Sequence, residues 1–190
     1  MYALTSASTL ILSFLFGIPM LIVLTRILLQ GFRAPFYHPV SQSWFKLTNP
    51  FFMPLQKVVP VVRGWHVGGI VLLLLLGILH AYTLSIVFGA SLGATGILVA
   101  GVGMALDFAL MSLFWLILVY VIVSWVAADS RSPMKEFVGF IARPICAPFR
   151  RLIPPIGMLD LSSMVVLLCL QLARILASGP LIAWGFGLRA

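Results

Sequence analysis

Long apolar stretches alternate with basic, proline-rich segments along the chain. Four stretches are nearly free of charge and are rich in Leu, Ile, Val, Phe and Gly. None alternates apolar and polar residues as a membrane β-strand does, and each has the roughly 20 residues that a helix needs to cross a hydrocarbon core. Because backbone groups in lipid must be satisfied within the segment, the pattern predicts four transmembrane helices. They are expected at about residues 9–30, 66–88, 104–127 and 160–183.

One proline-rich segment occurs twice, 94 residues apart. The sequence NPFFMPLQKVVP at 49–60 aligns without a gap with RPICAPFRRLIP at 143–154. Three prolines and one cation coincide in the pairs Pro50 and Pro144, Pro54 and Pro148, Lys57 and Arg151, and Pro60 and Pro154. Self-similarity at a fixed spacing predicts two tandem copies of one unit. The expected copies are residues 1–94, with a connector at 31–65, and residues 95–190, with a connector at 128–159.

Composition excludes a soluble fold and strengthens the prediction of helices in lipid. Hydrophobic residues make up 62% of the 190 residues and charged residues only 8%, whereas soluble domains carry about 25% charged residues. The expected fold class is therefore an all-α integral membrane protein with four transmembrane helices. These form two tandem parallel repeats, each a helical hairpin with an amphipathic, proline-bent connector.

The cations indicate which side each connector lies on. Four Lys and Arg residues fall in the first connector and five in the second, while the opposite side carries only Arg189. This bias predicts cytoplasmic connectors and both termini on the outer side. The net charge of +8 then reflects topology and attraction to anionic lipid headgroups. A nucleic-acid partner is not expected, because no soluble face would carry a basic patch.

Both connectors have the pattern of amphipathic helices. In the second, Met134, Phe137, Val138 and Ile141 follow helical spacing after Pro133, which predicts a helix in the headgroup plane. The recurring prolines then predict a separate, short and bent second piece in each connector. Two interpretations remain open. The segments are membrane-surface anchors, or they dip into the bilayer and line a path or a docking groove.

Few ionisable residues fall inside the predicted spans, so each needs an explanation. Arg174 lies deep in the fourth span, with Gln171 one turn earlier, and Asp107 falls near the outer end of the third. Asp107 is the acidic residue within axial reach of Arg174, so we predict an ion pair between the two spans. It is either a structural lock or part of a polar pathway.

His66 and His80 lie 14 residues apart on the second span, about 21 Å along a helix. A haem role fails, because each haem would need a second imidazole and the remaining histidine, His38, lies in a connector. Both are therefore expected to be hydrogen-bonded or interfacial polar positions, as are their second-copy counterparts Asp160 and Arg174. No metal site, cofactor or catalytic residue is predicted, and the chain is not expected to be an enzyme.

Glycines suggest two further features. Gly89, Gly93, Gly96, Gly101 and Gly103 predict a turn between the repeats. Small residues near the start of the second span favour close packing against the fourth span, either within one chain or between chains.

The second connector carries a Pro-x3-Pro-x2-Arg-x2-Pro-Pro-x-Gly-x2-Asp run, formed by Pro144, Pro148, Arg151, Pro154, Pro155, Gly157 and Asp160. With the first copy, it resembles the YggT family of small bacterial membrane proteins over nearly the whole chain. The first copy departs from the pattern, because His66 replaces the usual Asp. The resemblance implies an inner-membrane protein. Family members have been linked to osmotic or ion homeostasis, to cell-division gene neighbourhoods and, in plastids, to cytochrome maturation.

Asp160 is expected to act as a helix cap at the start of the fourth span or as a proton- or cation-binding carboxylate. Two function classes remain for the whole chain. One is a non-catalytic accessory, assembly or scaffold module that binds another membrane protein or complex. The other is a homo-oligomeric channel or transporter component in ion or osmotic homeostasis.

Overall fold

The computed structural model describes residues 2–35, 38–59, 61–62, 64–126, 133–152 and 161–188. Helices account for almost all of these ranges, and one very short β-hairpin accompanies them. The elements in chain order are α1 (Tyr2–Gly31), α2 (Pro39–Val58), β1 (Val61–Val62), β2 (Trp65–His66), α3 (Val67–Val87), α4 (Ala94–Val126), α5 (Pro133–Leu152), α6 (Leu161–Ala173), the π-helix η1 (Arg174–Ser178) and α7 (Gly179–Gly187).

Within the described ranges, four helical rods are long and apolar enough to cross a membrane, as predicted. They are Ser6–Gly31 of α1, α3, Ala94–Ser124 of α4, and the continuous rod of α6, η1 and α7. The third begins ten residues before its predicted start, at Ala94. This shift changes the depth assigned to every residue on α4.

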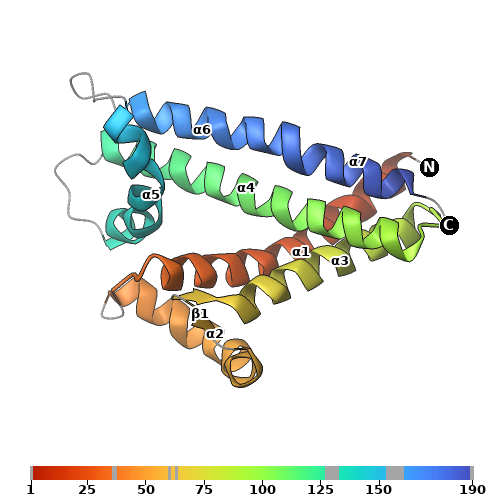
Figure 1. The fold of residues 1–190 in the computed structure, drawn as a ribbon, viewed down its shortest axis with the longest axis horizontal. Coiled ribbons are helices and arrows are strands. Elements are labelled where there is room, and N and C mark those ends of the chain that lie inside the picture. Colours follow the sequence, from red (N-terminus) through yellow and green to blue (C-terminus); the bar gives the residue numbers. More distant parts are fainter. Residues whose placement is uncertain are drawn as a thin grey trace.

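The four rods lie side by side, with α4 between α3 and the α6–α7 rod and with α1 against α3 (Figure 1). Both connector helices, α2 and α5, lie at one end of the bundle, and the two termini and the α3–α4 turn lie at the other. The two repeats therefore run in the same direction, so the parallel arrangement predicted from the chain is the one observed.

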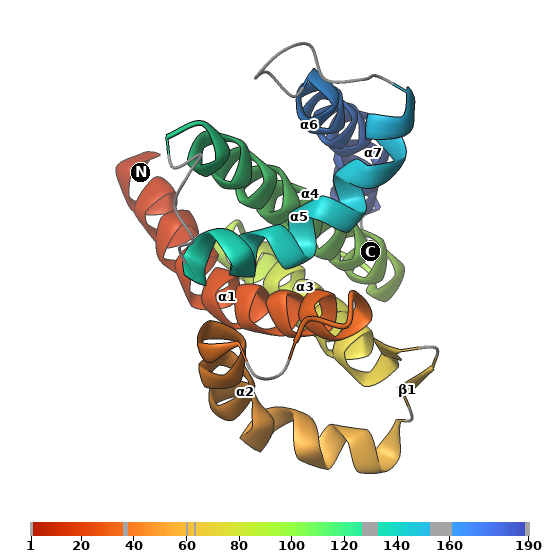
Figure 2. The same ribbon diagram turned by 90° about the vertical axis from the view of Figure 1, so that its left-hand side faces the viewer.

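The described part of each connector contains one helix, which continues where a separate second piece was predicted. α2 continues through the positions of Pro50 and Pro54, and α5 continues through Pro144 and Pro148. A proline removes one hydrogen bond and bends a helix, but the remaining bonds of a surface helix still form on either side. α2 is visibly bent midway along its length (Figure 2).

A β-hairpin with two residues in each strand lies between α2 and α3, and no sequence pattern predicted it. Val61 and Val62 pair antiparallel with His66 and Trp65. Gly64 has a φ of +90°, a conformation that L side chains rarely adopt. The Trp65 ring meets the Phe32 ring edge-on, with centroids 5.6 Å apart. The hairpin thereby fixes the start of α3 against the end of α1.

The glycine prediction is correct only in part. Gly89 and Gly93 lie in the turn after α3, but Gly96, Gly101 and Gly103 lie inside α4. Their absent side chains allow α4 to touch its neighbours at backbone distance. A Cβ on Gly101 would overlap the backbone of Ile78 on α3, and a Cβ on Gly103 would overlap Ile182 on α7.

Within one chain, the second and fourth spans do not make the close packing expected of them. Gly69, at the start of α3, faces Ile27 of α1 and Phe52 of α2. The α6–α7 rod lies on the far side of α4 (Figure 1). Small residues on α3 therefore pack α3 against its own repeat, and α4 separates it from the fourth span.

The connector ends of the two repeats are in contact. α5 crosses the ends of α4 and α6 and reaches α2 (Figure 2). His38, just before α2, is buried, and its Nε2 lies 3.7 Å from a carboxylate oxygen of Glu136 on α5. Its ring also contacts Phe140 edge-on, with centroids 5.2 Å apart. Ile141 of α5 belongs to the apolar core built mainly from α1.

Arg26 connects α2 to α1. Its guanidinium donates hydrogen bonds to Thr48 Oγ1 at 3.2 Å and Asn49 Oδ1 at 3.0 Å. It also stacks 4.0 Å from the Phe45 ring centre, a cation–π contact that is strongest when desolvated. The residue is only 6% exposed. Its charge is thus stabilised by an aromatic ring and neutral acceptors rather than by a carboxylate among the described residues.

Candidate functional site: a polar cluster in the middle of the bundle

Arg174 and Asp107 form a two-pronged ion pair between η1 and α4. Arg174 Nε donates to Asp107 Oδ1, and Nη2 donates to Oδ2, each at 3.0 Å. The third nitrogen, Nη1, donates to Gln171 Oε1 at 3.2 Å. Every guanidinium nitrogen therefore has a partner, which is the arrangement that a cation in lipid requires. The structure brings the three residues together as the sequence suggested.

Ser178 belongs to the same cluster, and sequence reasoning missed it. Its Oγ lies 2.9 Å from Asp107 Oδ1 and 2.9 Å from the Arg174 carbonyl oxygen. The helix is widened here, because Gly179 N–H donates to the carbonyl of Arg174, five residues earlier. Pro180 follows in the first turn of α7 and cannot donate a backbone hydrogen bond. The Ser-Gly-Pro run at 178–180, inside an apolar span, was the sequence signal that could have indicated this irregular turn.

The ion pair lies near the middle of the bundle rather than near the outer surface. Because α4 begins at Ala94, thirteen of its residues precede Asp107. Arg174 follows the 13 residues of α6 and precedes thirteen more up to Gly187. The expectation that Asp107 lies near the outer end of its span is therefore wrong, since the span was assigned ten residues too short. A charge pair at this depth is costly and typical of function or of specific assembly.

His80 occupies the position in the first repeat that Arg174 occupies in the second. The same 94-residue offset relates Ser13 to Asp107. In the first repeat the two positions are not linked, because Ser13 Oγ donates to the carbonyl of Thr9. The His80 ring stacks on Phe16, with centroids 4.9 Å apart. Within the described residues its Nε2 is enclosed without a hydrogen-bond partner.

A cavity of about 380 Å³ brings both repeats' polar positions together. Ser13, His80 and Asp107 supply its polar lining, and apolar side chains from α1, α3, α4 and α7 supply the rest. The polar lining is charge-balanced, because Arg174 neutralises Asp107 from behind. The site can therefore offer hydrogen bonds, but it carries no net charge to attract an ion.

His66 is a buried helix cap. Its Nδ1 accepts a hydrogen bond from the Gly69 N–H at 3.1 Å, which satisfies one of the free donors at the start of α3. Burial first, and then the positive charge of Arg26, lowers the pKa of His66 below its ordinary value of 6.5. The ring also meets Phe52 edge-on, with centroids 5.0 Å apart. Its role in this structure is local and structural.

The proline motif contributes little to this cluster. Pro50 on α2 and Pro144, Pro148 and Arg151 on α5 are exposed at the connector end. Pro54 and Lys57 lie within α2, at positions whose side chains are not described. The other predicted motif positions lie outside the described residues: Pro60, Pro154, Pro155, Gly157 and Asp160. No three His, Cys, Asp or Glu side chains in the described ranges group as metal ligands do.

The ion pair makes a prediction for paired substitutions. Asp107→Ala leaves the Arg174 charge unpaired in an apolar surround, and Arg174→Ala does the same to Asp107, so each is expected to cost about 3 kcal/mol of unfolding free energy. The double variant is expected to cost less than the sum, with a coupling of about 1–3 kcal/mol. Unfolding by SDS in mixed micelles measures all four proteins, with exposed Arg151→Ala as the control. Full additivity would show that the two side chains do not interact.

The buried cap makes a prediction for pH. Because the pKa of His66 is lowered in the folded chain, the unfolded chain binds the proton more readily. The stabilisation by neutral His66 is complete above pH 6.5 and is lost as the pH falls below that value. His66→Asn keeps a capping acceptor and does not titrate, so its melting temperature is expected to fall less between pH 8 and pH 5.5 than that of the unaltered chain. Circular dichroism in detergent measures this difference, and equal falls would contradict the prediction.

Comparison with known proteins finds one family model and several bacterial relatives that match the chain. A family model described as CCB3/YggT matches the chain twice, over residues 5–87 and 99–181. An uncharacterised protein from Vibrio alginolyticus, named for the proC 3′ region, is 35% identical over 176 residues, covering 87% of this chain and 90% of the relative. An uncharacterised protein from Pseudomonas aeruginosa is 33% identical, covering 96% and 94%. YggT of Escherichia coli K12, also called uncharacterised, is 32% identical, covering 85% and 84%.

No solved structure matches the chain. The two family matches are offset by the same 94 residues that separate Asp107 from Ser13 and Arg174 from His80. The chain therefore belongs to the CCB3/YggT family and carries its repeat twice.

Proposed function

We propose that the chain is a non-catalytic accessory or assembly module that binds another membrane protein. The observation that carries this proposal is an uncovered helix face. Leu10, Ile11, Phe14 and Leu15 in the first half of α1 are all more than half exposed, and α1 leans away from the other rods at its N-terminal end (Figure 2). Apolar exposure alone is normal in lipid, so the repeat supplies the decisive comparison.

The equivalent face in the second repeat is covered. Gly101 and Ala105 on α4 lie against Gly77 of α3, and the repeat offset relates them to Ala7 and Ile11 on α1. None of the described helices covers this face of α1, and Ile11 is 66% exposed. Among the described residues, α4 therefore has a neighbouring helix on this face and α1 has none.

A foreign protein fits this face better than another copy of the chain. On α6, Gln171 and Leu172 are the repeat counterparts of Gly77 and Ile78 on α3. An α6 face stacked on α1 would therefore replace the glycine contact by bulkier side chains. The tight packing of α3 on α4 cannot recur between copies, which favours a helix of different sequence as the partner.

The connector end supports membrane-surface contact on the cytoplasmic side of a bacterial inner membrane. Arg143, Arg150 and Arg151 are exposed on α5, a helix that lies across the end of the bundle (Figure 2). Cations in this position attract anionic headgroups, each by about 1 kcal/mol. This orientation also places both termini on the periplasmic side.

The partner proposal predicts position-specific crosslinking. A chain with p-benzoyl-phenylalanine in place of Ile11 is expected to give one discrete product with a different protein when native membranes are irradiated. The same group in place of Leu176, a 72% exposed lipid-facing position on η1, is the matched control and is expected to give none. Products with lipid alone would contradict the proposal.

The orientation predicts which lysine reacts from outside. A membrane-impermeant amine reagent is expected to modify Lys46, exposed on α2, only after cells are permeabilised. A lysine introduced by Ser91→Lys in the α3–α4 turn is the control and is expected to react in sealed cells. Peptide mass spectrometry locates the label, and modification of Lys46 in sealed cells would reverse the proposed topology.

A homo-oligomeric channel or transporter component is the second candidate, favoured by the polar cavity between the repeats. Four helices rarely enclose a pore alone, so this function needs several copies. In the crosslinking experiment it predicts a product between two copies from Ile11. Ion flux from liposomes that contain only the purified chain would then support the channel or transporter function and contradict the partner proposal.

A further inference from the structure

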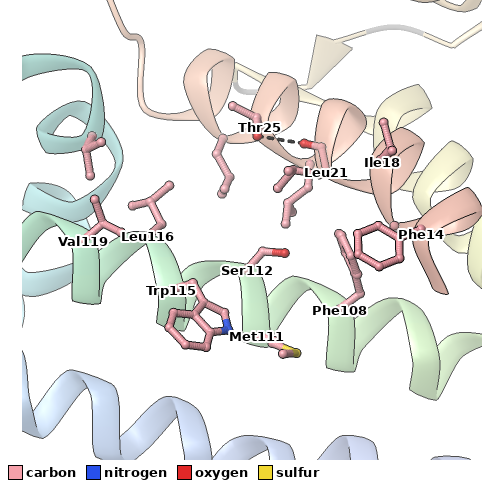
Figure 3. A pocket seen from close by; sticks show the side chains of 14 residues that line it. Phe14, Ile18, Leu21, Thr25, Phe108, Met111, Ser112, Trp115, Leu116 and Val119 are labelled. Atoms are coloured by element: carbon pink, nitrogen blue, oxygen red, sulfur yellow. Dashed lines mark hydrogen bonds between the residues drawn. The ribbon is translucent and has the colours of Figure 1, made fainter. Parts of the chain in front are cut away.

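Two neighbouring hollows on the bundle differ in what lines them. One is an apolar groove of about 540 Å³ between α1 and α4 (Figure 3). The other is the cavity of about 380 Å³ that contains Ser13 and Asp107. A Cβ on Gly17 would lie 3.6 Å from the Phe108 ring, so these two residues lie against each other between the hollows. Each hollow can therefore have its own occupant.

The groove offers an occupant no charged group among its lining residues. Ile18 and Leu21 of α1 lie across from Leu116 of α4, and Ser112 also faces the gap (Figure 3). The hydroxyl of Thr25 donates to the Leu21 carbonyl at 2.7 Å. Lipid tails cover such an apolar surface without loss of hydrogen bonds. The groove is therefore the lipid-filled reference for the cavity.

The cavity, in contrast, contains part of an ion pair. The side chains of Asp107 and Arg174 keep 28% and 26% of their area exposed, and Asp107 lines the cavity. Both charges lie near the middle of their rods, where contact with hydrocarbon is costly. Ionisable groups at this depth face the protein interior or a water-filled space. The exposed part of Asp107 therefore needs a polar neighbour.

Asp107 has unused capacity to accept a hydrogen bond. Its Oδ1 accepts from Arg174 Nε and from Ser178, whereas its Oδ2 accepts only from Arg174 Nη2 in the described part of the chain. A carboxylate oxygen has about two acceptor positions, so one remains at Oδ2. The neighbour that fills it must be a hydrogen-bond donor.

Ser13 presents a second acceptor to the same space. It is exposed, it lines the cavity, and it is the repeat counterpart of Asp107. Its hydroxyl donates to the Thr9 carbonyl at 2.8 Å, which leaves the oxygen as an acceptor. His80 contributes its ring to the lining, while its Nε2 is enclosed. The side-chain oxygens of the cavity therefore accept hydrogen bonds and do not donate them into it.

Water meets both requirements. A lipid tail has no donor, and a cation would find Asp107 already neutralised by Arg174. Water has two donors and no charge, and clustered molecules bond to one another where the apolar wall offers no partner. At about 30 Å³ for each molecule, about a dozen would fit in this volume. We propose that the cavity holds a cluster of water molecules that hydrates Asp107 in the middle of the membrane.

Radiolytic footprinting tests this proposal on the full chain, reconstituted in phosphatidylcholine nanodiscs. Short X-ray pulses convert water to hydroxyl radicals, which oxidise side chains next to the water that produced them. Met104 lines the cavity, and its thioether is oxidised to the sulfoxide. The lipid-facing control is the methionine introduced by Leu176→Met, at a 72% exposed position two residues beyond Arg174. Peptide mass spectrometry is expected to find Met104 oxidised about tenfold faster than this control.

Two serine variants separate the cavity from the groove. Ser13→Val replaces the acceptor oxygen by a methyl group, so the oxidation rate of Met104 is expected to fall about fivefold. Ser112→Val makes the same change in the groove and is the matched control, with no change expected at Met104. Circular dichroism checks that both variants are folded. If Ser13→Val is not, the comparison with Leu176→Met carries the test, because it leaves the cavity intact.

Oxidation of Met104 no faster than that of the lipid-facing control would overturn the proposal and assign the cavity to lipid tails. Equal oxidation of Met104 in the two serine variants would overturn it as well. The measurement uses the purified chain, so its outcome does not depend on the partner proposal. Ile11 and Ser13 also lie on different sides of α1, because residues two apart on a helix are separated by about 200°.

Discussion

The guanidinium of Arg174 has to find partners for all its N–H groups inside a medium that offers none, and the second repeat is arranged around that requirement. Asp107 supplies both carboxylate oxygens and Gln171 supplies a third acceptor. Ser178, the last residue of the widened turn η1, donates a further hydrogen bond to Asp107. The pair thus fixes the rotation of the fourth rod against α4 at one depth. Glycines in α4 then allow the backbones to meet on either side of it.

The first repeat meets the same requirement in a different way. Its buried cation is Arg26, near the connector end of α1, and neutral groups with two phenylalanine rings surround it. At the depth of Arg174 the first repeat has His80, which needs no counter-ion when neutral. One repeat is therefore held by an ion pair at mid-depth, and the other by a cation at its surface end. This difference leaves the enclosed Nε2 of His80 without a hydrogen-bond partner among the described residues.

The sequence predicted those features that follow from the rarity of charge in lipid. The four rods belong to this class, because long stretches without charge mark the spans. The Asp107–Arg174 pair belongs to it as well, because a charged residue inside a span has few possible partners. Ser178 could not be recognised in this way, since a serine in a helix ordinarily bonds its own backbone. Gly101 was assigned to a turn because glycine marks turns and close helix contacts alike, and composition cannot distinguish them. The hairpin at Trp65 is too short to show a repeating pattern of apolar and polar residues, so the sequence could not predict it. The helix α5 continues through Pro144 and Pro148, where breaks were expected.

The turn at residues 88–93 joins α3 and α4, whose backbones approach each other closely at Gly77 and Gly101. A short tether holds its two ends at an effective concentration of the order of millimolar. Association of the two hairpins is therefore set by the covalent link and does not depend on how many copies the membrane contains. Separate hairpins would have to find each other at the surface density of the protein, and their pairing would rise and fall with expression.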